Sequence, residues 1–186
     1  ADTLGSHSVA VGRGTLANQN FTTATDAYNV AVGSNTGNDI TTGVQNTLIG
    51  GLAGDALTDA DYNVAIGTSA LGADTLGSRA VAVGKSALAA QNFTTATNNY
   101  NVAVGYSAGG AMTTGTLNTL IGGLAGDALT SGNNNTAVGY LALSADTLGD
   151  RNTAIGNSAL AAQNFTTTTD SYNTAVGFTA GASITT

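Results

Sequence analysis

The side chains that could perform chemistry are few in this chain, and most of them recur at a fixed interval. Hydrolytic catalysis needs a nucleophile with a general base, or two positioned carboxylates. The chain has a single histidine, His7, and the matching positions 72 and 144 residues later hold Arg79 and Arg151. A position that exchanges imidazole for guanidinium in this way is a tolerant surface position. We therefore expect no catalytic residues and no enzyme activity.

The aspartates recur in the same way, and every acidic residue of the chain is an aspartate. Asp2, Asp74 and Asp146 occupy equivalent places, as do Asp55 and Asp127. An Asp beside Gly or Thr commonly accepts a hydrogen bond from its own backbone in a turn. We therefore expect these aspartates to be turn residues.

One group of three carboxylates, on Asp55, Asp59 and Asp61, offers the oxygen ligands that Ca²⁺ prefers. The next repeat replaces the last two by Ser131 and Asn133. The EF-hand loop and the nonapeptide calcium repeat are both absent from the sequence. The sequence therefore predicts no metal-binding and no cofactor-binding residue, although an ion on the axis of an oligomer stays open.

The charge balance limits the partners of the chain. Charged residues make up 8% of the 186 residues, and the formal net charge is −7, with only four Lys and Arg. Nucleic acids and anionic membranes are bound by basic surfaces, so neither is an expected partner. No stretch approaches the roughly 20 apolar residues of a membrane span, so we expect no membrane insertion in this segment.

The elements that position these side chains belong to a repeat of ten copies, of which residues 135–139 (Asn-Thr-Ala-Val-Gly) are the plainest. Its final glycine recurs at intervals of 21, 17, 17 and 17 residues, which together make a super-repeat of 72 residues. A fixed short period is typical of a solenoid, in which each coil buries its apolar face against its neighbours. We expect a single repeat array over residues 1–186, with super-repeats 1–72 and 73–144 and a partial one at 145–186. The array is expected to be a segment of a longer fibre.

Short strands are expected just before each glycine. The residue before the glycine is always Val or Ile, and the residue two places earlier is always Val or Thr, side chains that favour strands. Ala or Leu stands between them. Because side chains alternate between the two faces of a strand, one face is aliphatic and the other is small. This pattern predicts an all-β fold, a parallel β-roll or β-solenoid, with a very narrow interior over Ala and Gly.

The aliphatic face of these strands needs a partner, because ten stacked Val and Ile side chains left in water would form a large apolar stripe. The economical arrangement packs this face against the same face of other copies in a closed homo-oligomer. We call the predicted contact the interchain ridge. It consists of Val11, Val32, Ile49, Ile66, Val83, Val104, Ile121, Val138, Ile155 and Val176.

An Asn precedes most of the strands, and we expect it to support the stack. Side-chain amides that repeat about every 4.8 Å can form a hydrogen-bonded ladder. The predicted Asn ladder consists of Asn29, Asn46, Asn63, Asn101, Asn118, Asn135, Asn152 and Asn173.

Two further elements complete the predicted coil. A second short strand is expected after each glycine, around the Ala three residues on, as at Ala53 and Ala87, and a turn then closes the coil. The four extra residues of the long coil are expected in exposed loops on one side, at Phe21, Phe93 and Phe165. These loops either fold their rings back on the coil or form a contact surface for adhesion or fibre packing.

The repeated residues resemble two kinds of known fibre. Residues 152–159 (Asn-Thr-Ala-Ile-Gly-Asn-Ser-Ala) are similar to the head repeats of trimeric autotransporter adhesins, and equally to the Asn-Thr-Ala-Ile-Gly arrays of bacteriophage tail fibres. The resemblance covers essentially the whole chain. It implies a left-handed parallel β-roll, three intertwined chains in a homotrimer, and a surface-exposed fibre. The adhesin heads have shorter coils, so the 17- and 21-residue pattern leans toward the fibre-type arrays.

We therefore expect a structural and adhesive fibre segment, located outside the cell, on the cell surface or on a virion, which provides reach and multivalent attachment. Its expected partners are copies of itself, in a homotrimer or a higher fibre assembly, and a receptor on a host-cell or matrix surface. A bacteriophage tail or head fibre for host attachment is the first alternative. A monomeric ice- or ion-binding β-solenoid is the second, although Val interrupts the strand threonines and Asp59, Leu76 and Phe93 interrupt those of the turns.

Overall fold

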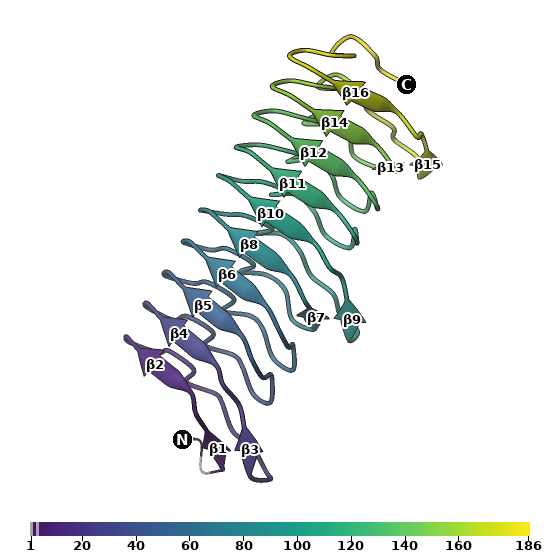
Figure 1. Ribbon diagram of the computed structural model, residues 1–186. Helices are drawn as coiled ribbons and strands as arrows, with labels where there is room; N and C mark the ends of the chain where they lie inside the picture. The colour runs from purple at the N-terminus through teal and green to yellow at the C-terminus, as the bar shows by residue number, and fades with distance from the viewer. Residues whose placement is uncertain (1, 3) are drawn as a thin grey trace.

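The chain winds into a column of stacked coils, shown in the computed structural model in Figure 1. The structure describes Asp2 and residues 4–186, so Ala1 and Thr3 at the start of the first predicted super-repeat lie outside the described residues. The described chain is all-β, with no helix and hence no helix able to cross a membrane. Ten three-residue strands form one parallel sheet, in the order β16-β14-β12-β11-β10-β8-β6-β5-β4-β2. They are β2 (Val9–Val11), β4 (Val30–Val32), β5 (Thr47–Ile49), β6 (Val64–Ile66), β8 (Val81–Val83), β10 (Val102–Val104), β11 (Thr119–Ile121), β12 (Thr136–Val138), β14 (Thr153–Ile155) and β16 (Thr174–Val176).

Each strand pairs with the same residues of the next coil. In the pairing of β10 with β11, for example, Val102 lies opposite Thr119 and Val104 lies opposite Ile121. Backbone hydrogen bonds between coils continue beyond the strands, as in the bond from the N–H of Gly54 to the carbonyl of Ala70, at 2.9 Å. The chain therefore satisfies its backbone groups largely along the solenoid axis. The predicted β-solenoid with coils of about 17 residues is confirmed.

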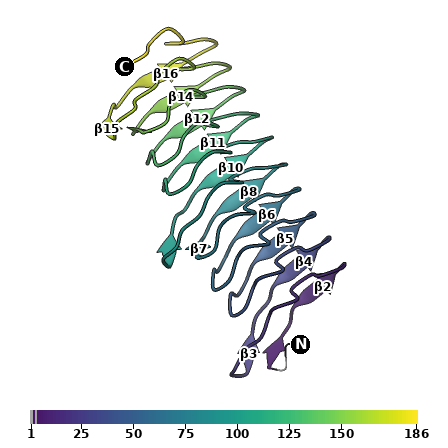
Figure 2. The same cartoon turned by 180° about the vertical axis from the view of Figure 1, so that it is seen from behind.

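Three shorter pairs of strands lie beside the main sheet, and each joins a long coil to the coil before it (Figure 2). One such pair occurs in each super-repeat, where the four extra residues widen the coil. The pairs are β1 (Gly5–Ser6) with β3 (Thr25–Asp26), β7 (Gly77–Ser78) with β9 (Thr97–Asn98), and β13 (Gly149–Asp150) with β15 (Thr169–Asp170).

The interior of the coils is fuller than the sequence pattern suggested. The central strand residue points inward, and Ala103 and Leu120 are both fully buried. The predicted narrow interior over Ala and Gly is wrong, because large side chains from the closing turn, such as Leu88 and Met112, fill the space opposite the strands.

The closing turn fills the interior in one of two ways. In five coils a Leu with positive φ is followed three residues later by a polar Asp or Gln, and in the other five a Gly is followed by Ile, Leu or Met. A Cβ on Gly54 would lie 2.8 Å from Cδ1 of Leu57 and 2.9 Å from Cδ2 of Leu48, so glycine leaves room for these neighbours. The five leucines are Leu16, Leu71, Leu88, Leu143 and Leu160, and the five glycines are Gly37, Gly54, Gly109, Gly126 and Gly181.

The second strand predicted after each glycine is wrong. The segments around Ala53 and Ala87 are turns in the described chain, and no strand is assigned to them. The residues on both sides of Ala87, Ser86 (φ 58°) and Leu88 (φ 49°), have the left-handed backbone conformation, which a strand does not contain. The turn directs the leucine into the core, which the sequence pattern alone did not indicate.

We expect Gly139→Ala to destabilise the coil. Gly139 has φ 138°, and an added Cβ would lie 2.5 Å from the carbonyl oxygen of Gly156 in the next coil. Left-handed strain alone costs about 1–3 kcal/mol, so the unfolding temperature should fall clearly. The matched control is Gly123→Ala, whose Cβ would meet nothing nearer than 3.5 Å. Equal thermal stability of the two variants would contradict the assigned role of Gly139.

Candidate functional site

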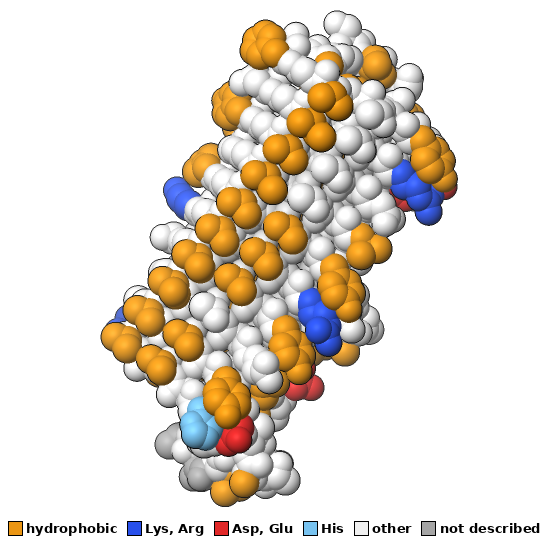
Figure 3. All heavy atoms as spheres, in the orientation of Figure 1, with side chains coloured by type: hydrophobic (Ala, Val, Ile, Leu, Met, Phe, Trp, Pro, Cys, Tyr) orange, Lys and Arg blue, Asp and Glu red, His pale blue; other side chains and the backbone are white. Residues whose placement is uncertain are grey.

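The interchain ridge predicted from the sequence lies on the outside of the chain. Within the ridge, Val11 is 56% exposed and Ile121 is 39% exposed, and the neighbouring column of Val and Thr also points outward. Figure 3 shows the ridge as an orange stripe along the sheet, beside a second column in which the Val side chains are orange and the Thr side chains are white. We call the two columns together the outer face. The second column consists of Val9, Val30, Thr47, Val64, Val81, Val102, Thr119, Thr136, Thr153 and Thr174.

The outer face is uncharged along its whole length, since all twenty of its side chains are Val, Ile or Thr. With a spacing of about 4.8 Å between coils, the ten strands extend over about 43 Å. Contiguous apolar surface of this kind marks interaction sites. The described residues enclose no pocket and contain no group of three His, Cys, Asp or Glu that could hold a metal ion. The outer face is therefore the candidate site.

The Asn residues before the strands lie inside the coil and support the outer face from behind. Asn118, for example, is fully buried. Its Nδ2 donates to the carbonyl of Gly132 at 2.8 Å, and its Oδ1 accepts the backbone N–H of Asn135 at 2.9 Å. Direct contacts between neighbouring amides are longer, as in the 3.3 Å from Asn46 Nδ2 to Asn29 Oδ1. The Asn column thus bonds mainly to the backbone of the next coils, and less from amide to amide.

The Asn column continues across a coil that lacks the Asn. Ala80 stands in that place, and its backbone N–H still donates to Asn63 Oδ1 at 2.9 Å. In the following coil the N–H of Asn101 is bound by Oδ1 of Asn99, also at 2.9 Å. Asn99 is fully buried, and Ala27 and Ser171 stand at its equivalent positions. A local substitution therefore compensates for the missing amide.

The predicted turn aspartates have an additional role in the interior of the long coils. Asp74 is fully buried, and its Oδ1 accepts the backbone N–H of Gly77 and of Phe93, both at 3.0 Å. Its Oδ2 accepts Nε2 of Gln91 at 2.6 Å, and Oε1 of Gln91 accepts Nδ2 of Asn101 at 2.9 Å. This chain of bonds connects the long coil to the Asn column. The role of the glutamines was not predicted, although Gln19, Gln91 and Gln163 follow the 72-residue period.

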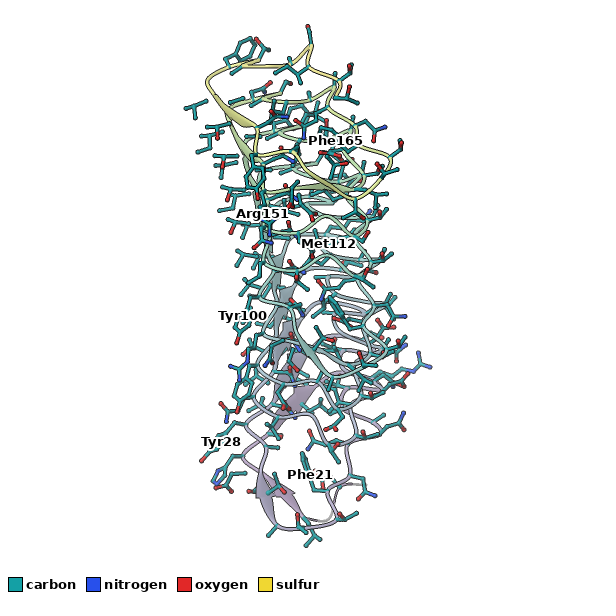
Figure 4. All side chains as sticks on the ribbon, turned by 90° about the vertical axis from the view of Figure 1, so that its right-hand side faces the viewer. Phe21, Tyr28, Tyr100, Met112, Arg151 and Phe165 are labelled. Atoms are coloured by element: carbon teal, nitrogen blue, oxygen red, sulfur yellow. The ribbon has the colours of Figure 1, made fainter. Side chains whose placement is uncertain are left out.

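The phenylalanines of the long coils are buried or half-buried, although the loop residues that follow them are exposed as predicted. Phe21 is 5% and Phe93 is 7% exposed, and Phe165 is half-buried. Figure 4 shows how Phe21 and Phe165 lie relative to the ribbon. The Asp74 carboxylate binds the N–H of Phe93 and holds this segment against the coil. Of the two possibilities left open for these loops, the rings fold back.

Two aspartates of the closing turns are partly withdrawn from water. Burial raises the pKa of Asp55 and of Asp127 above the usual aspartate value, because desolvation disfavours the charged form. Oδ1 of Asp127 is buried without a hydrogen-bond partner in the described chain. In contrast, the pKa of Asp2 is lowered, since hydrogen bonds from Gln19 and from backbone N–H groups outweigh its desolvation.

We expect Asn118→Ala to lower the stability of the array. The variant leaves the buried N–H of Asn135 and the carbonyl of Gly132 without their partners. Each unpaired buried group costs about 1–3 kcal/mol, so thermal unfolding should shift to clearly lower temperature. Asn157→Ala, at an exposed position, is the control and should unfold as the wild type does. If both variants unfold alike, the buried amide does not stabilise the stack.

We expect Asp127→Asn to raise the unfolding temperature at pH 7. The folded-state pKa of Asp127 is raised, so its charge lowers stability once the pH rises through that pKa. Below the unfolded value of about 3.9 the wild type is protonated in both states, and the advantage of the variant should vanish. Thermal unfolding between pH 3 and 7 measures this difference. A difference that does not change with pH would contradict the assignment.

Comparison of the chain with family models, with curated proteins and with solved structures gives no match.

Proposed function

We propose that the chain is a segment of a structural fibre, outside the cell or on a virion, that gives reach and multivalent attachment to a surface. In this proposal three copies pack side by side through their outer faces. The observation that supports it is the uncharged outer face, which extends over all ten strands while the interior of each coil is already filled by its own chain.

A second copy of the same chain is the partner that fits the outer face best. Every coil presents two β-branched residues at the same two positions, so a parallel copy in register meets an identical pattern. Identical subunits close most simply through rotational symmetry. The number of three chains and the left-handed winding come from the resemblance to adhesin heads and tail fibres. Both belong to the proposal.

The proposed attachment rests on repetition. The long coils and their surroundings recur every four coils, which corresponds to about 19 Å along the axis. Weak contacts that repeat at such a spacing add up to a strong attachment when several are engaged at once. A bacteriophage tail or head fibre uses the same physical arrangement, and the sequence flanking the array distinguishes it from a cell-bound fibre.

A monomeric ice-binding solenoid is the second candidate, and one observation favours it. Four successive strands present an outward Thr, at Thr119, Thr136, Thr153 and Thr174, which forms an unbroken rank at one end of the outer face. In this case the outer face meets ordered water rather than another chain. The chain is then folded as a monomer, which the fibre proposal excludes.

We expect Val138→Asp to abolish assembly. The change places a carboxylate in the middle of the outer face, where a dry contact between chains cannot solvate it. Sedimentation should show the wild type as an oligomer and the variant as a single chain. The control is Thr94→Asp, which adds the same charge at an exposed position of a long coil and should sediment like the wild type. A Val138→Asp variant that sediments with the wild type would refute the assignment of the outer face.

A further inference from the structure

A third column of residues runs along the chain beside the two columns of the outer face. The residue just before each Asn position has positive φ in all ten coils, as in Arg79 (φ 66°) and Tyr100 (φ 53°). We call these residues the edge column, and Figure 4 shows its members Tyr28, Tyr100 and Arg151 along one side of the molecule. The edge column consists of His7, Tyr28, Gln45, Tyr62, Arg79, Tyr100, Leu117, Asn134, Arg151 and Tyr172.

The three super-repeats differ in the partner of the basic residue in the edge column. His7 Nε2 lies 3.4 Å from a carboxylate oxygen of Asp26, and Arg151 forms an ion pair with Asp170. The equivalent position in the middle super-repeat is Asn98, whose Oδ1 accepts Nε of Arg79 at 3.0 Å. Within the described chain, Arg79 therefore has a neutral partner where the others have a carboxylate.

Arg79 also has more aromatic contact than the equivalent Arg151. Its guanidinium carbon lies 4.7 Å from the ring centre of Tyr62 and 5.9 Å from that of Tyr100. Among the described residues Arg151 lies over one ring, that of Tyr172 at 5.5 Å, because Asn134 replaces the second tyrosine. Two rings hold the guanidinium of Arg79 in place at the surface, and its two terminal nitrogens make no hydrogen bond within the described residues.

We propose that Arg79, with Tyr62 and Tyr100, binds an oxyanion, a carboxylate or a sulfate, carried by an acidic polysaccharide. The planar guanidinium presents a fork of N–H donors that matches such an anion, and it is weakly hydrated. Stacking between two rings fixes the fork before the ligand arrives, which lowers the entropy lost on binding. The phenol groups of Tyr62 and Tyr100 make no hydrogen bond within the described chain, so they are free to bind sugar hydroxyls on either side.

The charge of the chain selects a polysaccharide over a nucleic acid. DNA carries a phosphate about every 3.4 Å on each strand, and binding it requires many cations. This chain has a net charge of −7 and four basic residues, so a dense polyanion is repelled beyond the single site. The nearest acid on the adjacent coil is Asp61, whose Oδ1 accepts the N–H of Val44 at 2.8 Å. Burial raises the pKa of Asp61 and the charge of Arg79 partly offsets this rise, although the two side chains form no ion pair in the described chain.

This proposal names the chemical class of the surface to which the fibre would attach, and it rests on the fibre function proposed above. Its test is fluorescence anisotropy with two labelled dextrans, one sparsely sulfated and one sparsely carboxymethylated, which keep the charge density low and separate sulfate from carboxylate recognition. Unmodified dextran is the neutral control, and polyglutamate tests for an acidic protein partner. Because the assay measures binding only, a failure here leaves the sedimentation result unaffected.

The wild type should bind at least one of the two acidic dextrans, and Arg79→Gln should weaken that binding about tenfold or more, equivalent to about 1.4 kcal/mol. Asn98→Asp should weaken it similarly, because it gives Arg79 the carboxylate partner that Arg151 has. Arg151→Gln removes the same charge at a position where Asp170 already pairs with the arginine, so the affinity should stay within about twofold of the wild type.

Three results would overturn the proposal. The first is that the wild type binds neither acidic dextran, or that Arg79→Gln binds as the wild type does. The second is that Arg151→Gln loses as much affinity as Arg79→Gln, which would indicate diffuse charge attraction. The third is that unmodified dextran or polyglutamate binds as tightly as the acidic dextrans, which would exclude recognition of an anion on a polysaccharide.

Discussion

The in-register pairing of each coil with the next is the constraint on which the rest of this structure depends. The pairing of β10 with β11, and of every other neighbouring pair in the main sheet, joins equivalent residues. Each position of the repeat therefore becomes a column along the axis, with a like environment above and below. The backbone is satisfied along these columns, which allows a chain with few large side chains to fold without a large common core.

The columns divide the side chains into two groups: inward side chains, which pack within a single chain, and outward side chains, which do not. The inward Ala column, with Leu88 and Met112 and their equivalents, fills the coil from within a single chain. The Asn column and the buried Asp74–Gln91 pair use the same interior to bind backbone groups. The outward Val, Ile and Thr have no such partner in the chain. In the proposed fibre, other copies of the chain pack against these outward side chains.

The sequence predicted the strands and their period because β-branched residues alternate with Ala at every glycine. It failed where the backbone conformation, rather than hydrophobic alternation, decides the structure. The turn after each glycine has residues with positive φ, such as Ser86 and Leu88, and it was predicted as a strand. That error also led to the prediction of a narrow interior, since the leucines of the turn were not directed inward.

The candidate site was also predicted only in part, because some of its contacts join residues that are far apart in the sequence. The outward columns follow directly from the alternation of side chains, and their positions are as predicted. The burial of Phe93 depends on the Asp74 carboxylate, which lies 19 residues earlier in the chain, and such a contact is not visible in a local pattern. The difference between Arg79 and Arg151 likewise depends on residue 98 or 170 in the following coil. Only the structure brings these residues together.

The most direct test of the account is the native mass of the unmodified chain in solution, measured by light scattering. The proposed homotrimer predicts a mass of about three times the 18.1 kDa of one chain. A folded particle with the mass of a single chain would contradict the account, because the outer face would then be stable in water without a partner.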